Sequence, residues 1–456
     1  MKVDEKIQLS DLGGKLTRLF ELAGEKILAI ERSWDHGLGT PVFTVDGQYT
    51  TRGWTEWTQG FQFGCAILNF EATGNEKFLE LGRSATLERM APHVTHTGVH
   101  DHGFNNVSTY GNLRRQMQEG VIEKDEWERH FYEMALKVSG ATQAARWTVT
   151  HDGGGFIPSF NGPHSLFSDT IRSCRSLGLA HQLGHVLMGE NDEAISLLNR
   201  MIQHAESTAR FNVYYGEGKD AYDQRGRVVH ESIFNTNDGK YRCPSTQQGY
   251  SPFSTWTRGL AWVVTGFAEL LEFLEVIPEA ECEVSGGMGV VKSFMEKAAL
   301  ASADFYIHSA AAADGIPYWD TGAPGLAQMG EYLSVPADPE NEFEPVDSSA
   351  AAISAQGLYR LGKYLGEEAG KRYRQAALKV ANTLFSAPYL SEDSRHQGLI
   401  LHSIYHRPNG WDQMQEGCKV PSGESSMWGD YHALELGLLL QKELEGKPYL
   451  TFFDKE

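Results

Sequence analysis

A repeated pair of helices constrains the fold of this chain more than any other feature of its sequence. In each pair, a helix rich in small and apolar residues ends in a short turn containing Gly with Asn or Glu, and a more amphipathic helix follows. Apolar residues recur at three- and four-residue spacing in both, which is the helical period. The clearest pairs span 60–90, 168–208 and 347–385, and long alternating strand patterns are scarce.

The two helices of each pair predict two different positions in the fold. A helix that is apolar on nearly all sides belongs inside, and its amphipathic partner belongs outside. Repeated pairs of this kind close into two concentric rings, or they stack as an open solenoid. Because the repeats diverge and the loops vary widely in length, we favour closure. The sequence therefore predicts an all-α (α/α)6 barrel that spans 1–456 as one domain.

Four long loops between the helices hold the unusual residues. The segments 93–104, 147–169, 227–256 and 406–431 are rich in Gly, His, Trp and Asn. Such loops at the same ends of successive hairpins are typical of one face built for ligand binding.

The charge and the aromatic content limit the classes of ligand. The formal net charge of −20 repels phosphate backbones and no basic stripe is present, so we expect no nucleic-acid partner. An anionic substrate would need a local Arg or His. Ten Trp and eighteen Tyr provide flat faces that suit stacking on sugar rings.

The N-terminal segment and the hydropathy indicate where the protein acts. No apolar segment follows the first charges, and no window approaches the length of a membrane span. We therefore expect a cytoplasmic protein with no membrane partner, as a monomer or a small homo-oligomer.

Two aspartates stand at predicted helix starts in these loops. Asp101 lies between His100 and His102, and Asp169 follows Ser168. An Asp at such a position is commonly a helix N-cap, which stabilises by about 1 kcal/mol. As a pair they admit a second interpretation, since sugar cleavage commonly uses two carboxyl groups that face each other across a site.

Further candidates lie in the segment before the helix at 257. Arg258 offers a planar, permanently charged fork for a carboxylate, while Trp256 and Trp262 are equally compatible with a stacking role and with the core. His230 is upstream in a loop, where a lone His is usually structural. The remaining histidines lack the spacing of a metal site, so we expect neither a metal nor another cofactor.

Six segments resemble the unsaturated glucuronyl hydrolases of glycoside hydrolase family 88, and more distantly the unsaturated rhamnogalacturonyl hydrolases. They run in the family's order from about residue 50 to the end. The segments are HDHGF at 100–104, SDT at 168–170, TQQGYSPFSTWTRGLAW at 246–262, IPYWD at 316–320, DSSAAAISAQGL at 347–358 and WGDYHALE at 428–435.

The resemblance implies an α6/α6 barrel without a metal and gives roles to the candidate residues. Asp169 would be the general acid and base, and Asp101 would hold the substrate and assist the second carboxyl. The positions that match the family's sugar-binding residues are Trp57, His230, Gln248, Trp256, Arg258 and Trp262.

The reaction that the resemblance implies is hydration of a 4,5-unsaturated uronic acid at the non-reducing end of a lyase product. Protonated Asp169 would give its proton to C4, and water would then attack C5. On this interpretation a neighbouring Asp101 would usefully raise the pKa of Asp169 through like-charge repulsion.

Three segments depart from the family pattern and leave alternatives open. The stretch before Asp169 is long and carries His151 and His164, the chain has SPFSTW after QGY, and it has GESSMWGDY at 423–431. These departures concern the preference among uronides. The alternatives are a conventional inverting glycosidase on saturated uronides, a sugar epimerase, and a carbohydrate-binding protein that would not need Asp169.

Overall fold

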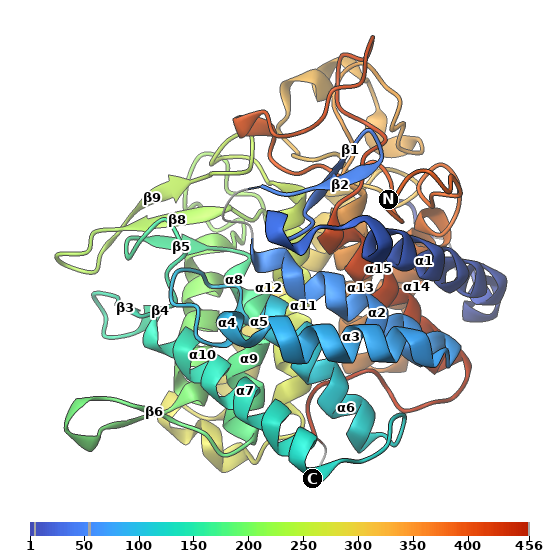
Figure 1. The fold of residues 1–456 in the computed structure, drawn as a ribbon. Coiled ribbons are helices and arrows are strands. Elements are labelled where there is room, and N and C mark those ends of the chain that lie inside the picture. Colours follow the sequence, from blue (N-terminus) through green and yellow to red (C-terminus); the bar gives the residue numbers. More distant parts are fainter. Residues whose placement is uncertain (4–5, 53–55, 455–456) are drawn as a thin grey trace.

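The computed structural model describes residues 1–3, 6–52 and 56–454, in which two concentric rings of helices form a closed barrel (Figure 1). Neighbouring inner helices pack against one another all the way round the ring, from α2 to α15 and back to α2. The inner helices are α2 (Gln59–Thr73), α5 (His102–Asn106) with α6 (Asn112–Gln118), α8 (Thr170–Ser173) with α9 (Arg175–Gln182), α11 (Thr257–Leu274), α13 (Ser348–Tyr364) and α15 (Met427–Leu444). The predicted (α/α)6 barrel is confirmed.

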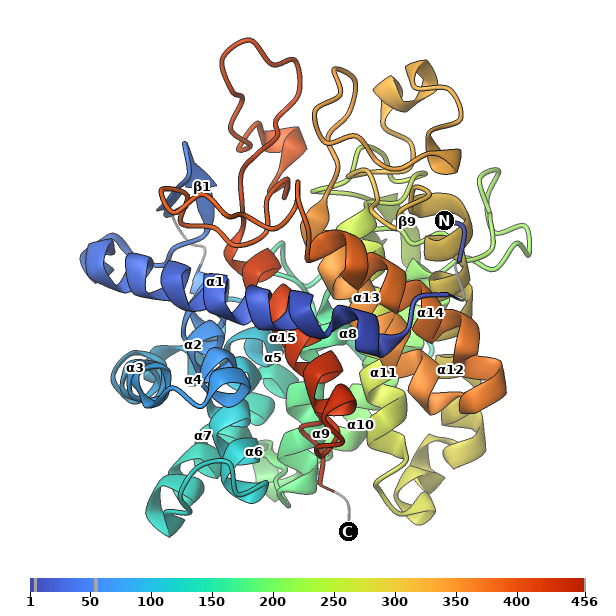
Figure 2. The same cartoon turned by 90° about the vertical axis from the view of Figure 1, so that its right-hand side faces the viewer.

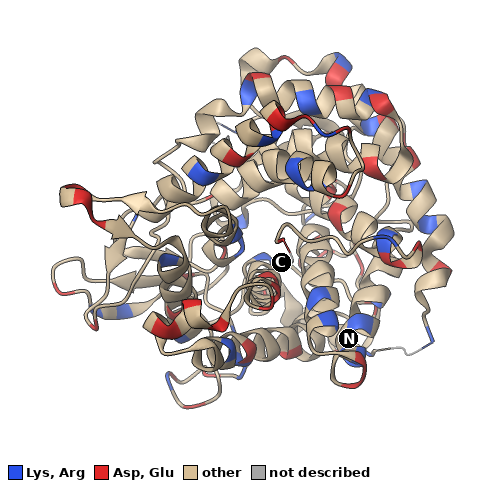
Figure 3. Cartoon of the chain, turned by 90° about the horizontal axis from the view of Figure 1, so that it is seen from below, with Lys and Arg blue, Asp and Glu red and all other residues tan. Residues whose placement is uncertain are grey.

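An outer helix covers each inner one, as the amphipathic pattern predicts. The outer helices are α1 (Gly13–Ser33), α3 (Glu76–Arg89), α7 (Glu126–Ala145), α10 (Leu197–Ser207), α12 (Met288–Phe305) and α14 (Glu367–Leu384), with the short α4 (Ala91–Val94) after α3. Seen from below, residues of both charges lie around the outer ring (Figure 3). In the described ranges no helix is long and apolar enough to cross a membrane.

The inner helices fit together because small residues let their backbones approach. In α13 every residue from Ser348 to Gly362 is buried. A Cβ on Gly357 would lie 2.6 Å from the Thr265 Oγ1 of α11, closer than Cβ atoms approach non-bonded atoms in proteins. A larger residue at this position would push α13 away from α11.

The first and last helices of the chain close the ring. Helix α15 packs against α2 on the inside, and α1 lies across both from the outside (Figure 2). The last inner helix therefore takes its outer partner from the opposite end of the sequence. The pattern of consecutive hairpins did not predict this pairing.

The second predicted hairpin differs from the structure between its two helices. Helix α9 ends at Gln182, and a small hairpin of β6 (Leu187–Met188) and β7 (Ala194–Ile195) precedes α10. The sequence Gly189–Asp192 is the turn of this hairpin, in which Asn191 adopts a left-handed conformation. Asn tolerates this conformation better than most residues, which suits it to the turn. The predicted turn is confirmed, and the helix predicted before it was too long.

Short strands in the loops order the end of the barrel that carries the site. The paired strands are β1 (Phe43–Val45) with β2 (Gln48–Thr50), β3 (Thr148–Val149) with β4 (Gly155–Phe156), and β5 (Ser165–Phe167) with β8 (Glu231–Phe234), which also pairs with β9 (Tyr241–Ser245). In the antiparallel β5–β8 pair, Phe167 lies opposite Glu231, and the Ser168 amide donates to the His230 carbonyl (2.8 Å). This pairing fixes the chain just before Asp169.

Candidate active site

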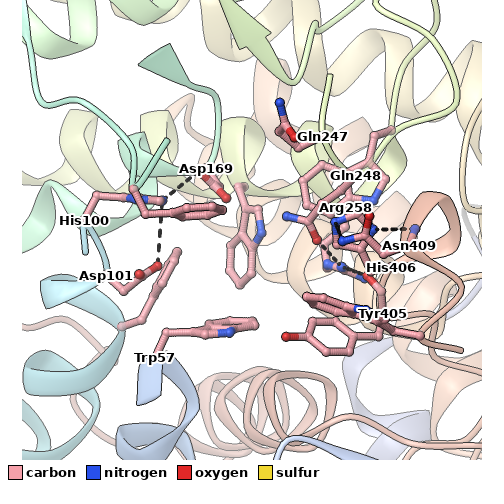
Figure 4. Close-up of a pocket in the computed structure, with 15 residues that line it drawn as sticks. Trp57, His100, Asp101, Asp169, Gln247, Gln248, Arg258, Tyr405, His406 and Asn409 are labelled. Atoms are coloured by element: carbon pink, nitrogen blue, oxygen red, sulfur yellow. Dashed lines mark hydrogen bonds and ion pairs between the residues drawn. The ribbon is translucent and has the colours of Figure 1, made fainter. Parts of the chain in front are cut away.

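A pocket opens at the end of the barrel where the inner helices begin. It contains about 740 Å³ of empty space, open mouth included, which is within the usual range for a small-ligand site. The residues that line it are Trp57, His100, Asp101, Phe104, Phe160, Asp169, Gln247, Gln248, Trp256, Arg258, Trp262, Tyr405, His406, Asn409 and Trp411 (Figure 4).

The inner helices point their N-termini at this pocket. Asp101, Asp169 and Trp256 are the residues immediately before α5, α8 and α11, and Trp57 precedes α2 by two residues. The backbone N–H groups of a first turn carry a partial positive charge. This end of the barrel therefore favours an anionic ligand, which partly offsets the repulsion from the net charge of −20.

The two aspartates do not cap their helices. Each occupies an N-cap position, but neither side chain accepts a hydrogen bond from the first turn. Both carboxylates instead face the same imidazole nitrogen. His100 Nε2 lies 3.2 Å from Asp169 Oδ1 and 3.8 Å from Asp101 Oδ1 (Figure 4). The helix-cap interpretation is wrong for both residues. The two carboxyl groups lie in one site, as the paired interpretation predicted.

The three groups shift one another's protonation. Burial raises the pKa of Asp101 above its ordinary value. Burial acts in the same direction on Asp169, but the charge and the hydrogen bond of His100 outweigh it and lower the pKa of Asp169. The two carboxylates raise the pKa of His100 although burial opposes this. The upward shift expected for Asp169 is therefore absent in the free protein, because His100 lies between the carboxylates.

Arg258 is more fully engaged than the sequence suggested. Its Nη1 donates to Asp347 Oδ2 (3.0 Å) and to the Ile404 carbonyl, and its Nη2 donates to Gln248 Oε1 (3.0 Å) and to the Tyr405 carbonyl (2.6 Å). The guanidinium also lies 4.7 Å from the centre of the Trp256 ring and 4.9 Å from that of Trp428. Four of its donors therefore hold protein groups.

His230 lies behind the wall of the pocket and does not line it. Its Nδ1 accepts from the backbone amides of Gln247 (3.0 Å) and Gln248 (3.3 Å). Its ring packs against Phe167 and Trp256, at centroid distances of 4.4 and 4.7 Å. Burial lowers the pKa of His230 to about 4, so it is neutral near pH 7. In this position it orients the turn that carries Gln248.

The three predicted tryptophans all line the pocket. Trp57 is partly exposed and stacks on Trp428, with ring centres 5.0 Å apart and planes at 28°. Trp256 and Trp262 are almost fully buried, and Trp262 packs on Phe104 at 4.8 Å. Trp256 and Trp262 thus belong to the core and to the lining at once.

Several lining residues were not predicted from the sequence. Tyr405, His406, Asn409 and Trp411 come from the loop before α15, and Phe160 comes from the long stretch before Asp169. The segments 147–169 and 406–431, singled out for their composition, contain these residues except Tyr405, but nothing in the residue spacing identifies individual contacts. Among the residues that the structure describes, no group of three or more His, Cys, Asp or Glu side chains could hold a metal ion.

Sequence comparisons relate the chain to one group of enzymes. No family model matches it. The chain is 26% identical to the unsaturated glucuronyl hydrolase of Formosa agariphila over 386 residues, which cover 83% of this chain and 78% of that one. It is 25% identical to the enzyme of the same name from Bacillus sp. strain GL1, with 88% and 90% covered. It is also 25% identical to the unsaturated chondroitin disaccharide hydrolase of Streptococcus pyogenes, with 94% and 92% covered.

Solved structures of unsaturated glucuronyl hydrolases share the fold of this chain. An unsaturated glucuronyl hydrolase specific for heparin superposes with a TM-score of 0.71 at 20% identity, covering 97% of this chain and all of that one. The enzyme from Streptococcus agalactiae gives a TM-score of 0.70 at 20% identity, with 96% and 94% covered. The resemblance seen in the six sequence segments is therefore confirmed, and so is the barrel that it implies.

Proposed function

We propose that this chain, a homologue of the unsaturated glucuronyl hydrolases, removes a 4,5-unsaturated uronic acid from the non-reducing end of oligosaccharides that a polysaccharide lyase has produced. The observation that carries this proposal is the pair of uncapped aspartates, Asp101 and Asp169, which share the His100 nitrogen in a pocket lined by aromatic rings. The relatives are named for unsaturated glucuronyl and unsaturated chondroitin disaccharide substrates, which agrees with this proposal.

Asp169 is the group that we assign to proton transfer. The C4=C5 bond of the substrate is a vinyl ether. Asp169 in its protonated form gives a proton to C4, and the positive charge that develops at C5 is shared with the ring oxygen. Water adds to C5 and loses its proton to the Asp169 carboxylate, which restores the acid. The hemiketal then opens, and the remaining saccharide leaves from C1.

Asp101 and the aromatic rings supply binding and electrostatic support. The charge that develops at C5 is positive, so a carboxylate on the same wall as Asp169 stabilises it. Trp57 has one ring face against Trp428 and lies at the opening, where it can stack on a sugar ring. Gln248, held by Arg258, and Gln247 provide amide groups for the hydroxyls. A protein that only bound sugars would not need buried carboxylates of this kind.

The proposal is tested with matched unsaturated and saturated disaccharides. We expect the ultraviolet absorbance of the C4=C5 bond to disappear with the unsaturated uronide, and the saturated counterpart to remain intact. In water enriched with heavy oxygen, the label should enter at C5. Cleavage of the saturated uronide with the label at C1 would instead establish the conventional inverting glycosidase, and binding without turnover of either compound would establish a carbohydrate-binding protein.

A further inference from the structure

We infer that His100 is a positioning residue that holds the catalytic proton between Asp101 and Asp169 and delivers it to Asp169 when the sugar enters. The inference rests on the proposed function, because it concerns the supply of the proton that Asp169 gives to C4. It accounts for a conflict in the site, where Asp169 must act as an acid but lies beside a cationic partner.

The geometry of His100 directs one nitrogen at both carboxyl groups. Nε2 lies 3.2 Å from Asp169 Oδ1 and 3.8 Å from Asp101 Oδ1, so this nitrogen carries a hydrogen while both aspartates are ionised. The ring cannot turn away, because it stacks on Phe160 (6.2 Å between centres, 16°) and meets Phe167 edge-on (5.7 Å, 83°). The side chain is 2% exposed, so bulk water does not replace its partners.

The other side of the ring has no basic or acidic partner in the described part of the chain. His100 Nδ1 is buried and makes no hydrogen bond. A proton on His100 is therefore in direct contact only with Asp169 and Asp101. An imidazolium is costly to bury, and passing the Nε2 proton to a carboxylate removes this charge from the ring while Nδ1 keeps its hydrogen.

Four other charged or titratable groups lie around His100 and the two aspartates, namely His96, Arg146, His204 and His230. Arg146, after α7, is close enough to Asp101 to lower its proton affinity, and its own donors bind the carbonyls of residues 97, 158 and 159. His204 on α10 is neutral near pH 7, since burial lowers its pKa to about 3. His230 is neutral as well, with a pKa of about 4.

The transfer balances without an added reactant. In the free protein His100 Nε2 and Asp169 Oδ1 share one hydrogen bond, and we place its proton on the imidazole, as an imidazolium beside a carboxylate. An anionic uronate in the pocket raises the proton affinity of Asp169, and the Nε2 proton moves to Asp169 Oδ1, leaving neutral His100 and a carboxylic acid. Asp169 then protonates C4 and later takes one proton from the attacking water. That proton can return to His100 when the product leaves, so the cycle consumes one water.

The test is the pH dependence of kcat/KM for an unsaturated disaccharide in wild type and in His100→Gln. Gln keeps an amide donor near the position of Nε2 but does not titrate. Wild type should keep its activity to a pH above 6.5, the ordinary pKa of His, because the bridge raises the pKa of His100. In the variant only a carboxyl group can hold the proton, so the falling limb should move to lower pH, and the loss at about pH 8 should exceed that at about pH 5 by roughly tenfold or more.

A matched control separates this effect from a structural one. His402 is also buried and accepts the Gly423 amide, but it does not line the pocket. His402→Gln should leave the shape of the pH profile unchanged. For a second readout, imidazole should restore activity to His100→Ala at high pH, whereas pyrazole, a ring of similar size and much weaker basicity, should not.

Three results would overturn the inference while leaving the proposed function intact. These are a wild-type falling limb below pH 6.5, a loss in His100→Gln that is equal at all pH values, and a limb that moves to higher pH. The last would show that His100 only lowers the pKa of Asp169. Absence of turnover by wild type would instead reject the proposed function, and the inference with it.

Discussion

The two sides of the pocket use their charged groups in opposite ways. On the aspartate wall, formed by His100, Asp101 and Asp169, the carboxylates share one nitrogen and leave their helix starts uncapped. On the anchor wall, formed by Arg258, Asp347 and Tyr405, four guanidinium donors bind protein acceptors, and Asp347 also caps α13. Both walls are buried. The polar groups of the aspartate wall remain available to the substrate, whereas those of the anchor wall bind protein groups and hold the shape of the pocket.

Asp169→Asn should show the largest effect of these changes, on kcat and not on stability. We expect kcat to fall by about 10³-fold or more, since the amide cannot supply a proton, while the melting temperature changes little because the side chain caps nothing. Loss of the substrate's ultraviolet absorbance measures the first, and thermal unfolding measures the second. Asp125 is a true N-cap of α7 and accepts from the Glu128 amide at 2.9 Å. Asp125→Asn should leave kcat unchanged, and near-normal activity of Asp169→Asn would reject the assignment.

Asp347→Asn should show the reverse pattern on the anchor wall. It leaves the Arg258 guanidinium, 1% exposed, without its buried counter-charge, so we expect a loss of about 3 kcal/mol in the free energy of unfolding. Urea unfolding followed by circular dichroism measures this loss. Glu367→Gln breaks an ion pair whose carboxylate is 87% exposed and should cost less than about 1 kcal/mol. Equal effects of the two changes would mean that the anchor wall is not held by this pair.

Asp320, whose backbone pairs with that of Trp256 in the pocket lining, should make stability depend on pH. It is fully buried, accepts from the amides of Tyr250 and Gly322 (both 2.8 Å), and has its pKa raised from 3.8 to about 6, mainly by burial. Because the pKa is raised in the folded state, the contribution of Asp320 to the free energy of unfolding is fully present below pH 3.8 and is lost as the pH rises through 6. Between about pH 4 and 7 the free energy of unfolding of Asp320→Asn should therefore increase relative to that of wild type, by at most about 3 kcal/mol.

The measurement for Asp320 is the free energy of unfolding at several pH values. The exposed Asp238, whose side chain accepts the Lys240 amide in a turn, provides the control. The free energy of unfolding of Asp238→Asn should vary with pH in parallel with that of wild type over this range. A constant difference between Asp320→Asn and wild type would show that Asp320 does not titrate as described.

Trp57, between the two walls, should give the smallest effect. Trp57→Ala removes a stacking face, so we expect KM to rise about fivefold with kcat nearly constant, in line with about 1 kcal/mol for an aromatic contact. Trp127→Ala removes a ring that is 79% exposed on the outer helix α7 and should change neither constant. An unchanged KM in Trp57→Ala would place the sugar elsewhere in the pocket.

The sequence predicted the barrel well because helical periodicity is a local property. It also predicted that Asp101 and Asp169 lie in one site, since short motifs carry their positions, and the pocket contains both, while their catalytic roles stay predictions. It could not show that His100 lies between them, because that contact depends on how α5 and α8 pack. The partners of Arg258 include Tyr405, which is 147 residues away, in a loop without periodicity. Contacts of that range become visible only when the fold brings the loops together.

The closure of the ring by α1 and α15 also sets an order of events during folding. Trp57 lies just before α2, and its stacking partner Trp428 lies at the start of α15, so this part of the pocket forms only after the final helix has left the ribosome. Until then α2 and α13 each lack α15, one of the apolar helices that pack against them. Contacts between such distant segments slow folding and prolong the exposure of apolar surface. The packing of the last inner helix is thus the step at which a nascent chain gains both a closed barrel and a complete pocket.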